Sequence, residues 1–261
     1  TGVDSKGDVA IEQDINLTDI GRYQNGSTAP YHLINVCLNL QGSNDPDIRD
    51  RASDFFIFSK KFIGGKRTGY CRTETMEQVH PKMSLATAMA ISAAAASPNM
   101  GRGTNPALVA LMVLLNIRLG YWLPNPGLLE EILHENPIVR WFKKLAGKWE
   151  KIERTPGRFN FIDIFQQELI DIEERWENVY QSGSDCRKLH SENDKTITTT
   201  TVEHDLVGVG LSGGGIRSAT INLGITQALQ ERGVFDHIDY MSTVSGGGYL
   251  GSSISTLMRY K

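Results

Sequence analysis

The sequence has few of the residues that build disulfide frameworks or metal centres. Its three cysteines, Cys37, Cys71 and Cys186, are odd in number and widely spaced, so we expect free thiols in a reducing compartment. The six histidines show no metal-ligand spacing. We therefore expect neither a metal site nor a bound cofactor.

The sequence also has little excess charge and no long apolar run. The formal net charge of −3 argues against nucleic-acid binding driven by overall charge. The longest apolar run, residues 107–115, is shorter than the roughly 20 residues of a membrane-spanning helix. It favours a buried core helix over one that dips into a lipid surface. The N-terminus has no signal-peptide pattern, and we expect a soluble, cytoplasmic globular protein.

Apolar periodicity predicts a first block of mixed elements and then a helical region. The first block should contain two strands, an alanine-rich helix that Ser84 caps and a core helix, at residues 32–40, 55–58, 84–96 and 105–121. Apolar side chains between residues 161 and 172 recur every three or four positions, which marks an amphipathic helix. Residues 182–204 are polar and threonine-rich, so we expect a flexible linker.

From residue 206 onward the chain repeats a strand–turn–helix pattern. Strands are expected at 206–211 and 238–244, and each is followed by a glycine-rich turn and a helix, at 217–232 and 246–259. This is the unit of a parallel sheet covered by helices. We therefore predict an α/β fold with a mainly parallel central sheet and helices on both faces.

The second of these turns has the setting of a nucleophile. Ester hydrolysis needs an activated nucleophile and fixed donors for the oxyanion that forms. Ser245 follows a strand and precedes three glycines that open a helix, so it would be exposed on a sharp turn at a positive helix end. The usual pattern is G-x-S-x-G, and Thr243 replaces its first glycine here. The alternative is that Ser245 is only a helix N-cap.

The first turn supplies the other half of such a site. Gly213, Gly214 and Gly215 can direct successive N–H groups at one anion, and Arg217 adds a positive charge. The turn is therefore a candidate oxyanion hole.

A dinucleotide site is the alternative for this turn, because residues 208–213 match G-x-G-x-x-G. Such a site also needs an acid at the C-terminal end of the next strand, and Ser245 occupies that place. The acids Asp236 and Asp239 lie at the strand's other end. We therefore favour the oxyanion hole.

Two stretches resemble a known family: GLSGGGIRSATINLG at 210–224 and DYMSTVSGGGYLG at 239–251. They are similar to the glycine turn and serine elbow of the patatin-like phospholipases. PYHLINVCLNL, AMAISAAAASPNMG and NIRLGYW, in the first half of the chain, resemble the larger bacterial-type members. The likeness covers roughly residues 30–126 and 205–257.

The resemblance implies one α/β hydrolase-type sandwich domain that hydrolyses lipid acyl esters with a serine–aspartate dyad. On that likeness Ser245 is the nucleophile. Gly213, Gly214 and Gly215 form the oxyanion hole beside Arg217.

Two departures from the family concern segment order and the base. In the family the glycine turn and serine elbow precede the block that resembles residues 88–101, whereas here they follow it. The family's aspartate lies in Asp-Gly-Gly or Asp-Gly-Ala, and this chain has no Asp-Gly dipeptide. Asp185 is the nearest candidate by position. A circular permutant, a chain with omitted pieces and a fragment without its base all fit the order, and we favour two pieces of one larger chain.

Two smaller features leave alternatives open. His204 and His237 flank the two strands and could serve a Ser-His-Asp triad, although both lie at N-terminal strand ends. Residues 141–151 are basic and aromatic, typical of a helix that rests on an anionic membrane or of an ordinary solvated helix. The sequence thus predicts a serine-dependent lipid hydrolase with peripheral membrane contact and no nucleic-acid partner. A catalytically silent module that binds anionic lipid head groups is the alternative.

Overall fold

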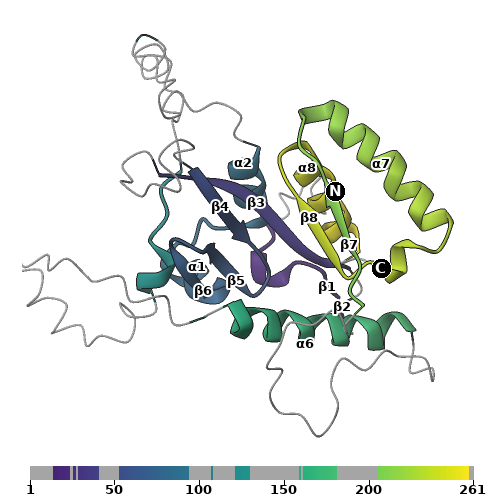
Figure 1. The fold of residues 1–261 in the computed structure, drawn as a ribbon, viewed down its shortest axis with the longest axis horizontal. Coiled ribbons are helices and arrows are strands. Elements are labelled where there is room, and N and C mark those ends of the chain that lie inside the picture. Colours follow the sequence, from purple (N-terminus) through teal and green to yellow (C-terminus); the bar gives the residue numbers. More distant parts are fainter. Residues whose placement is uncertain are drawn as a thin grey trace, which may run out of the picture.

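The fold is built on a six-stranded sheet in the order β6-β5-β4-β3-β8-β7 (Figure 1). The computed structural model describes residues 14–23, 26–27, 29–40, 53–93, 107, 121–129, 159, 161–180 and 205–258. Strands β3 to β8 are Tyr31–Asn39, Ser53–Phe58, Phe62–Gly65, Gly69–Arg72, Gly208–Leu211 and Tyr240–Thr243. A separate antiparallel pair joins β1, Arg22–Tyr23, to β2, Gly26–Ser27. Because β3 pairs with β8, the first block and the last block of the chain share one sheet.

The expectation of a mainly parallel sheet is wrong. Strand β8 runs parallel to β3 and to β7, but the pairs β3–β4, β4–β5 and β5–β6 are antiparallel. Only residues 59–61 separate β4 from β5, and only residues 66–68 separate β5 from β6. Such short links return the chain antiparallel, whereas a parallel pair needs a crossover of roughly a dozen residues or more. The observed architecture is a mixed sheet with helices, of the α/β class.

The helices begin and end at residues with suitable chemistry. Helix α2, Leu85–Ser92, starts after Ser84, whose side chain accepts a hydrogen bond from the Thr87 N–H as predicted. Gly233, at φ 68°, lies just after α7 and ends it. Other helical elements are η1, Leu17–Asp19; α1, Thr73–Val79; α6, Phe161–Tyr180; α7, Gly215–Glu231; η4, Phe235–His237; and α8, Gly246–Leu257. The core helix expected within 105–121, the stretch 141–151 and the linker at 182–204 fall almost wholly outside the described residues.

Helices lie on both faces of the sheet. Alternate residues of β3 point to opposite sides, so Ile34 packs in one cluster with Leu85 of α2, while Tyr31 packs in another with Trp176 of α6. A third cluster joins β7 and β8 to Leu250 of α8. No helix in the described part of the chain is both long enough and apolar enough to cross a membrane.

Candidate active site

Ser245 lies at a strained bend between β8 and α8. Its φ of 51° and ψ of −118° fall in a region that residues other than glycine rarely adopt, at a cost of about 1–3 kcal/mol. Ser245 occupies the N-cap position of α8, but its side chain makes no capping hydrogen bond. The hydroxyl of this half-buried residue is therefore not used to cap the helix.

Glycines allow the bend to pack against the first turn. A Cβ atom on Gly246 would lie 2.2 Å from the carbonyl oxygen of Gly215, and one on Gly247 would lie 2.1 Å from that of Leu211. Neither separation leaves room for a side chain. The two glycine-rich turns are thus in direct backbone contact.

The glycine turn at residues 213–215 lies beside Ser245. A Cβ on Gly213 would be 3.2 Å from the Ser245 Cβ, and Gly214 and Gly215 have φ values of 138° and 66°. No acceptor among the described residues binds the N–H groups of Gly213 or Gly214. Gly215 opens α7, where the first N–H groups have no partner within the helix. These exposed donors could bind an oxyanion near Ser245.

The turn is anchored by α7. The Ser218 hydroxyl and the Asn222 side-chain amide both donate to the carbonyl oxygen of Ser212, the amide at 3.2 Å. Asn222, which makes this bond, is buried. Arg217 is exposed in the first turn of the same helix. The side of the turn that faces α7 is thus fixed, while the glycine N–H groups stay open.

A hydrogen-bonded clamp holds the Ser245 bend from the side of α2 and β3. The Ser245 N–H donates to Ser92 Oγ at 2.9 Å, and the Ser92 hydroxyl donates to the Asn35 carbonyl oxygen at 2.6 Å. The Asn35 side chain in turn donates to the Thr243 carbonyl oxygen at 3.0 Å and to Ser242 Oγ at 2.8 Å. The strained backbone is therefore supported by a helix and a strand from the first half of the chain.

Neither Ser92 nor Asn35 was singled out from the sequence. Their only local signal is a polar residue among apolar or small neighbours, in the strand at 32–40 and in the helix at 84–96. Their partners are more than 150 positions away: the bond between Ser92 and Ser245 spans 153 positions, and the bond between Asn35 and Thr243 spans 208. A local pattern cannot identify such a pairing.

A buried histidine forms a hydrogen bond with Thr243, two residues before Ser245. His32 is 1% exposed, and its Nε2 lies 2.8 Å from Thr243 Oγ1 while its Nδ1 lies 3.1 Å from Ser255 Oγ. Burial lowers the pKa of His32 to about 3, so the ring is neutral. Thr243, the departure from the usual G-x-S-x-G pattern, fits because α8 presents Gly251 to it: a Cβ there would lie 2.5 Å from Thr243 Cγ2.

No base is hydrogen-bonded to the Ser245 hydroxyl among the described residues. Within that part of the chain, no carboxylate or imidazole bonds to the Ser245 hydroxyl. Asp185 and His204 lie outside it. His237 lies in η4, before β8, at the opposite end of the strand from Ser245. The described residues also contain no group of three His, Cys, Asp or Glu side chains that could hold a metal ion.

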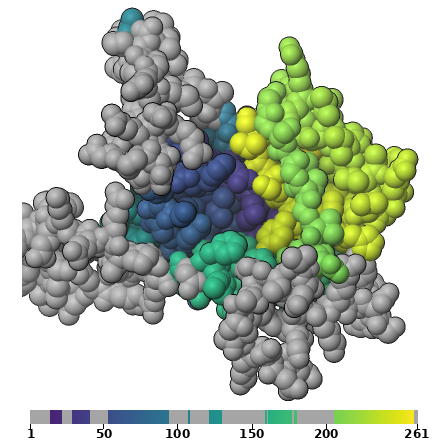
Figure 2. All heavy atoms as spheres, in the orientation of Figure 1, coloured from purple at the N-terminus to yellow at the C-terminus, as the bar shows by residue number. Residues whose placement is uncertain are grey.

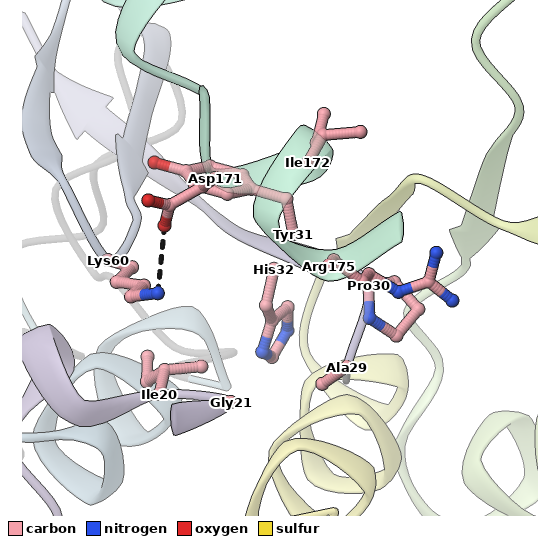
Figure 3. Close-up of a pocket in the computed structure, with 10 residues that line it drawn as sticks. All are labelled: Ile20, Gly21, Ala29, Pro30, Tyr31, His32, Lys60, Asp171, Ile172 and Arg175. Atoms are coloured by element: carbon pink, nitrogen blue, oxygen red, sulfur yellow. Dashed lines mark ion pairs between the residues drawn. The ribbon is translucent and has the colours of Figure 1, made fainter. Parts of the chain in front are cut away.

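A buried polar cluster joins α6 to the N-terminal ends of β3 and β8. Residues around its small pocket include His32, Lys60, Asp171 and Arg175 (Figure 3). Lys60 Nζ lies 2.8 Å from Asp171 Oδ2. Glu168 accepts a hydrogen bond from Tyr240 at 2.9 Å, and burial raises the pKa of Glu168 to about 7. The cavity, about 10 Å³, holds one water molecule at most and is no substrate site.

Asp239 lies at the same end of the strands and has a structural role. Its carboxylate accepts hydrogen bonds from Trp176 Nε1 at 2.6 Å and from the Val207 N–H at 2.8 Å. It is buried and lies at the N-terminal end of β8. It therefore cannot bind a ribose at the glycine turn, as a dinucleotide site would require.

The structure brings Ser245, the three glycines and Arg217 to the C-terminal ends of β7 and β8, and Asp185 falls outside the described residues. Comparison with known families and proteins adds no further guide. No family model matches the chain, and neither the curated proteins nor the solved structures gave a match. What the site can do therefore follows from its own geometry.

Proposed function

We propose that the protein is a serine-dependent hydrolase of lipid acyl esters. The observation that carries this is the contact between the strained Ser245 bend and a glycine turn whose N–H groups are open. A serine that does not cap its helix lies beside donors that have no acceptor among the residues that the structure describes, and these are the two components that acyl transfer requires.

In the proposed reaction the Ser245 hydroxyl attacks the ester carbonyl carbon and gives its proton to a base. The oxyanion that forms accepts hydrogen bonds from the N–H groups of Gly213 and Gly214, and the dipole of α7 and the charge of Arg217 add to them. The alcohol leaves with a proton, and water then releases the acid from the acyl-enzyme. By resemblance to the patatin-like phospholipases the base is an aspartate, and Asp185 remains its candidate.

We also propose that residues 30–126 and 205–257 belong to one patatin-like domain in the cytoplasm. The pairing of β3 with β8 and the bond from Ser245 to Ser92 support this, because each joins one segment to the other. The reversed order of the segments is compatible with one site, because the hydrogen bond from Ser245 to Ser92 joins the later segment to the earlier one.

Hydrolysis of a dissolved p-nitrophenyl ester tests the proposed function. Ser245→Ala should remove turnover, because Ser245 is the proposed nucleophile and the nearby Ser218 hydroxyl is bonded to the Ser212 carbonyl oxygen. Ser253→Ala is the matched control: this exposed serine of α8 bonds only to the Tyr249 carbonyl of its own helix. Turnover that survives Ser245→Ala would contradict the proposal.

A catalytically silent module that binds anionic head groups at residues 213–217 is the second candidate. It is favoured by one observation: no base contacts the Ser245 hydroxyl within the described residues. This candidate predicts binding of inorganic phosphate that Arg217→Gln weakens, without any ester turnover. Ester turnover that depends on Ser245 would eliminate it.

A further inference from the structure

Helix α7 buries a polar residue, although the rest of the helix is largely open to water. The helix lies at the surface, in the lime region of Figure 2, and Asn222 is its one buried residue, at 6% exposed. Asparagine is a weak helix former, and burial of its amide is unfavourable unless the amide is hydrogen-bonded. The hydrogen bonds of Asn222 therefore account for its position in the helix.

Asn222 and Ser218 together hold the Ser212 carbonyl group. The Asn222 side-chain amide donates to the Ser212 carbonyl oxygen at 3.2 Å and to Ser218 Oγ at 3.1 Å. The Ser218 hydroxyl donates to the same carbonyl oxygen. Two side chains of one helix thus use both lone pairs of a single backbone carbonyl group at the start of the glycine turn.

The direction of this carbonyl group determines the direction of the Gly213 N–H. The Ser212 carbonyl and the Gly213 N–H belong to one planar, trans peptide group. In such a group the two bonds point in opposite directions, so a carbonyl held toward α7 leaves the Gly213 N–H pointing away from these α7 side chains. Gly213 is also the glycine that lies beside Ser245, since a Cβ built on it would be 3.2 Å from the Ser245 Cβ.

The backbone of the turn cannot fix this direction by itself. Glycine adopts left-handed and right-handed conformations with similar ease, so three successive glycines leave the peptide group at residues 212–213 free to rotate. Rotation would turn the Gly213 N–H away from its present direction. An oxyanion hole is effective only when its donors are in place before the reaction begins. The peptide group therefore needs an anchor outside the turn.

We propose that Asn222 and Ser218 are positioning residues, which hold the Ser212 carbonyl group and thereby fix the Gly213 N–H in the orientation that binds the oxyanion. This inference rests on the proposed function and adds two residues on which that site depends. Neither residue needs to contact the substrate, because both act through the peptide group between Ser212 and Gly213. The burial of a polar side chain in α7 is thereby explained.

Nuclear magnetic resonance relaxation of the ¹⁵N-labelled protein tests the positioning without turnover. The Gly213 N–H of the parent protein should have the order parameter of a rigid backbone, about 0.85. In the double variant Ser218→Ala/Asn222→Ala this value should fall below about 0.6, with intermediate values in the single variants. Thr220→Ala is the matched control, because this exposed hydroxyl of α7 donates to the Ile216 carbonyl oxygen of its own helix at 2.9 Å.

Hydrolysis of a p-nitrophenyl ester supplies a second readout. Ser218→Ala should lower kcat on the order of tenfold and leave KM nearly unchanged, because the oxyanion forms only during the reaction. The double variant should approach the loss of about 100- to 1000-fold that follows removal of an oxyanion donor. Ser218→Thr retains the hydroxyl and should restore most of kcat. Thr220→Ala should leave both constants at their parent values.

The outcomes separate this inference from the proposed function. A Gly213 N–H that stays rigid in the folded double variant would overturn the inference, and so would equal kcat values for Ser218→Ala and Thr220→Ala. If Asn222→Ala does not fold, Ser218→Ala decides alone, because alanine suits a helix and Ser218 is only partly buried. If the N–H becomes mobile but Ser245 supports no ester turnover, the two side chains still fix the N–H and the hydrolase proposal fails.

Discussion

Removal of the Ser92 hydroxyl should loosen the bend that presents Ser245. Ser92 Oγ accepts the Ser245 N–H at 2.9 Å and donates to the Asn35 carbonyl oxygen at 2.6 Å. In the Ser92→Ala variant both backbone groups lose this partner. Alanine suits the end of α2 and adds no bulk, so the variant should still fold.

The expected loss in the free energy of unfolding of Ser92→Ala is comparable with the backbone strain at Ser245. Each hydrogen bond contributes about 0.5–1.5 kcal/mol net, and a buried group left without a partner costs about 1–3 kcal/mol. Because the site is half-buried, water replaces part of the loss, and we expect about 1–2 kcal/mol in the free energy of unfolding. The backbone of Ser245 stores a similar strain of about 1–3 kcal/mol. A relaxed bend should therefore become populated and slow the reaction of Ser245 on the order of tenfold.

Three measurements check this prediction. Urea unfolding gives the loss of stability, amide hydrogen exchange at Ser245 reports the freed N–H, and the rate of fluorophosphonate labelling reports the reactivity of the hydroxyl. Ser253→Ala is the control, because its hydroxyl bonds only within α8. If Ser92→Ala leaves both the exchange of the Ser245 amide and the stability at wild-type values, the clamp does not hold the bend.

Two further predictions concern packing and pH. Gly247→Ala should destabilise the fold by about 1–3 kcal/mol, because its Cβ would lie 2.1 Å from the Leu211 carbonyl oxygen. Gly224→Ala, where a Cβ meets nothing within 4 Å, should be neutral or stabilising by up to about 1 kcal/mol. Equal stabilities of the two variants in urea unfolding would contradict the close contact between Gly247 and Leu211. Burial raises the pKa of Glu168 from 4.5 to about 7, so the folded protein retains a proton that the unfolded chain releases. Stability should therefore fall between about pH 5 and 7, by on the order of 2–3 kcal/mol, and level off above that range. Glu168→Gln should remove most of this slope, and an unchanged slope would show that another group titrates.

The C-terminal segment of the fold, from residue 206 onward, could be predicted because its signals are local. The repeated strand, turn and helix after residue 206 lie close to where glycines and apolar periodicity place them. The glycines of both turns are needed for reasons that sequence chemistry supplies, since they permit positive φ and close backbone approach. The same local chemistry identified Ser84 as a cap.

The strand directions in the first half of the chain, and the hydrogen bonds that hold Ser245 and Thr243, depend on contacts between residues far apart in the sequence. The parallel pattern after residue 206 does not extend to the whole sheet, because the short links on either side of β5 require antiparallel pairs. In the sequence, His32 is one of six scattered histidines. Only the pairing of β3 with β8 places it beside Thr243. Ser92 has no signal near it in the sequence that indicates its bond to Ser245.

Labelling with a fluorophosphonate followed by peptide mapping tests the central claim most directly. The reagent reacts with activated serine hydroxyls, so it reports nucleophile and oxyanion hole together without the need to know the natural lipid. We predict one adduct, on Ser245, that is lost in Ser245→Ala and retained in Ser253→Ala. An adduct on another serine, or no adduct on folded protein, would contradict the assignment of this end of the strands as an acyl-transfer site.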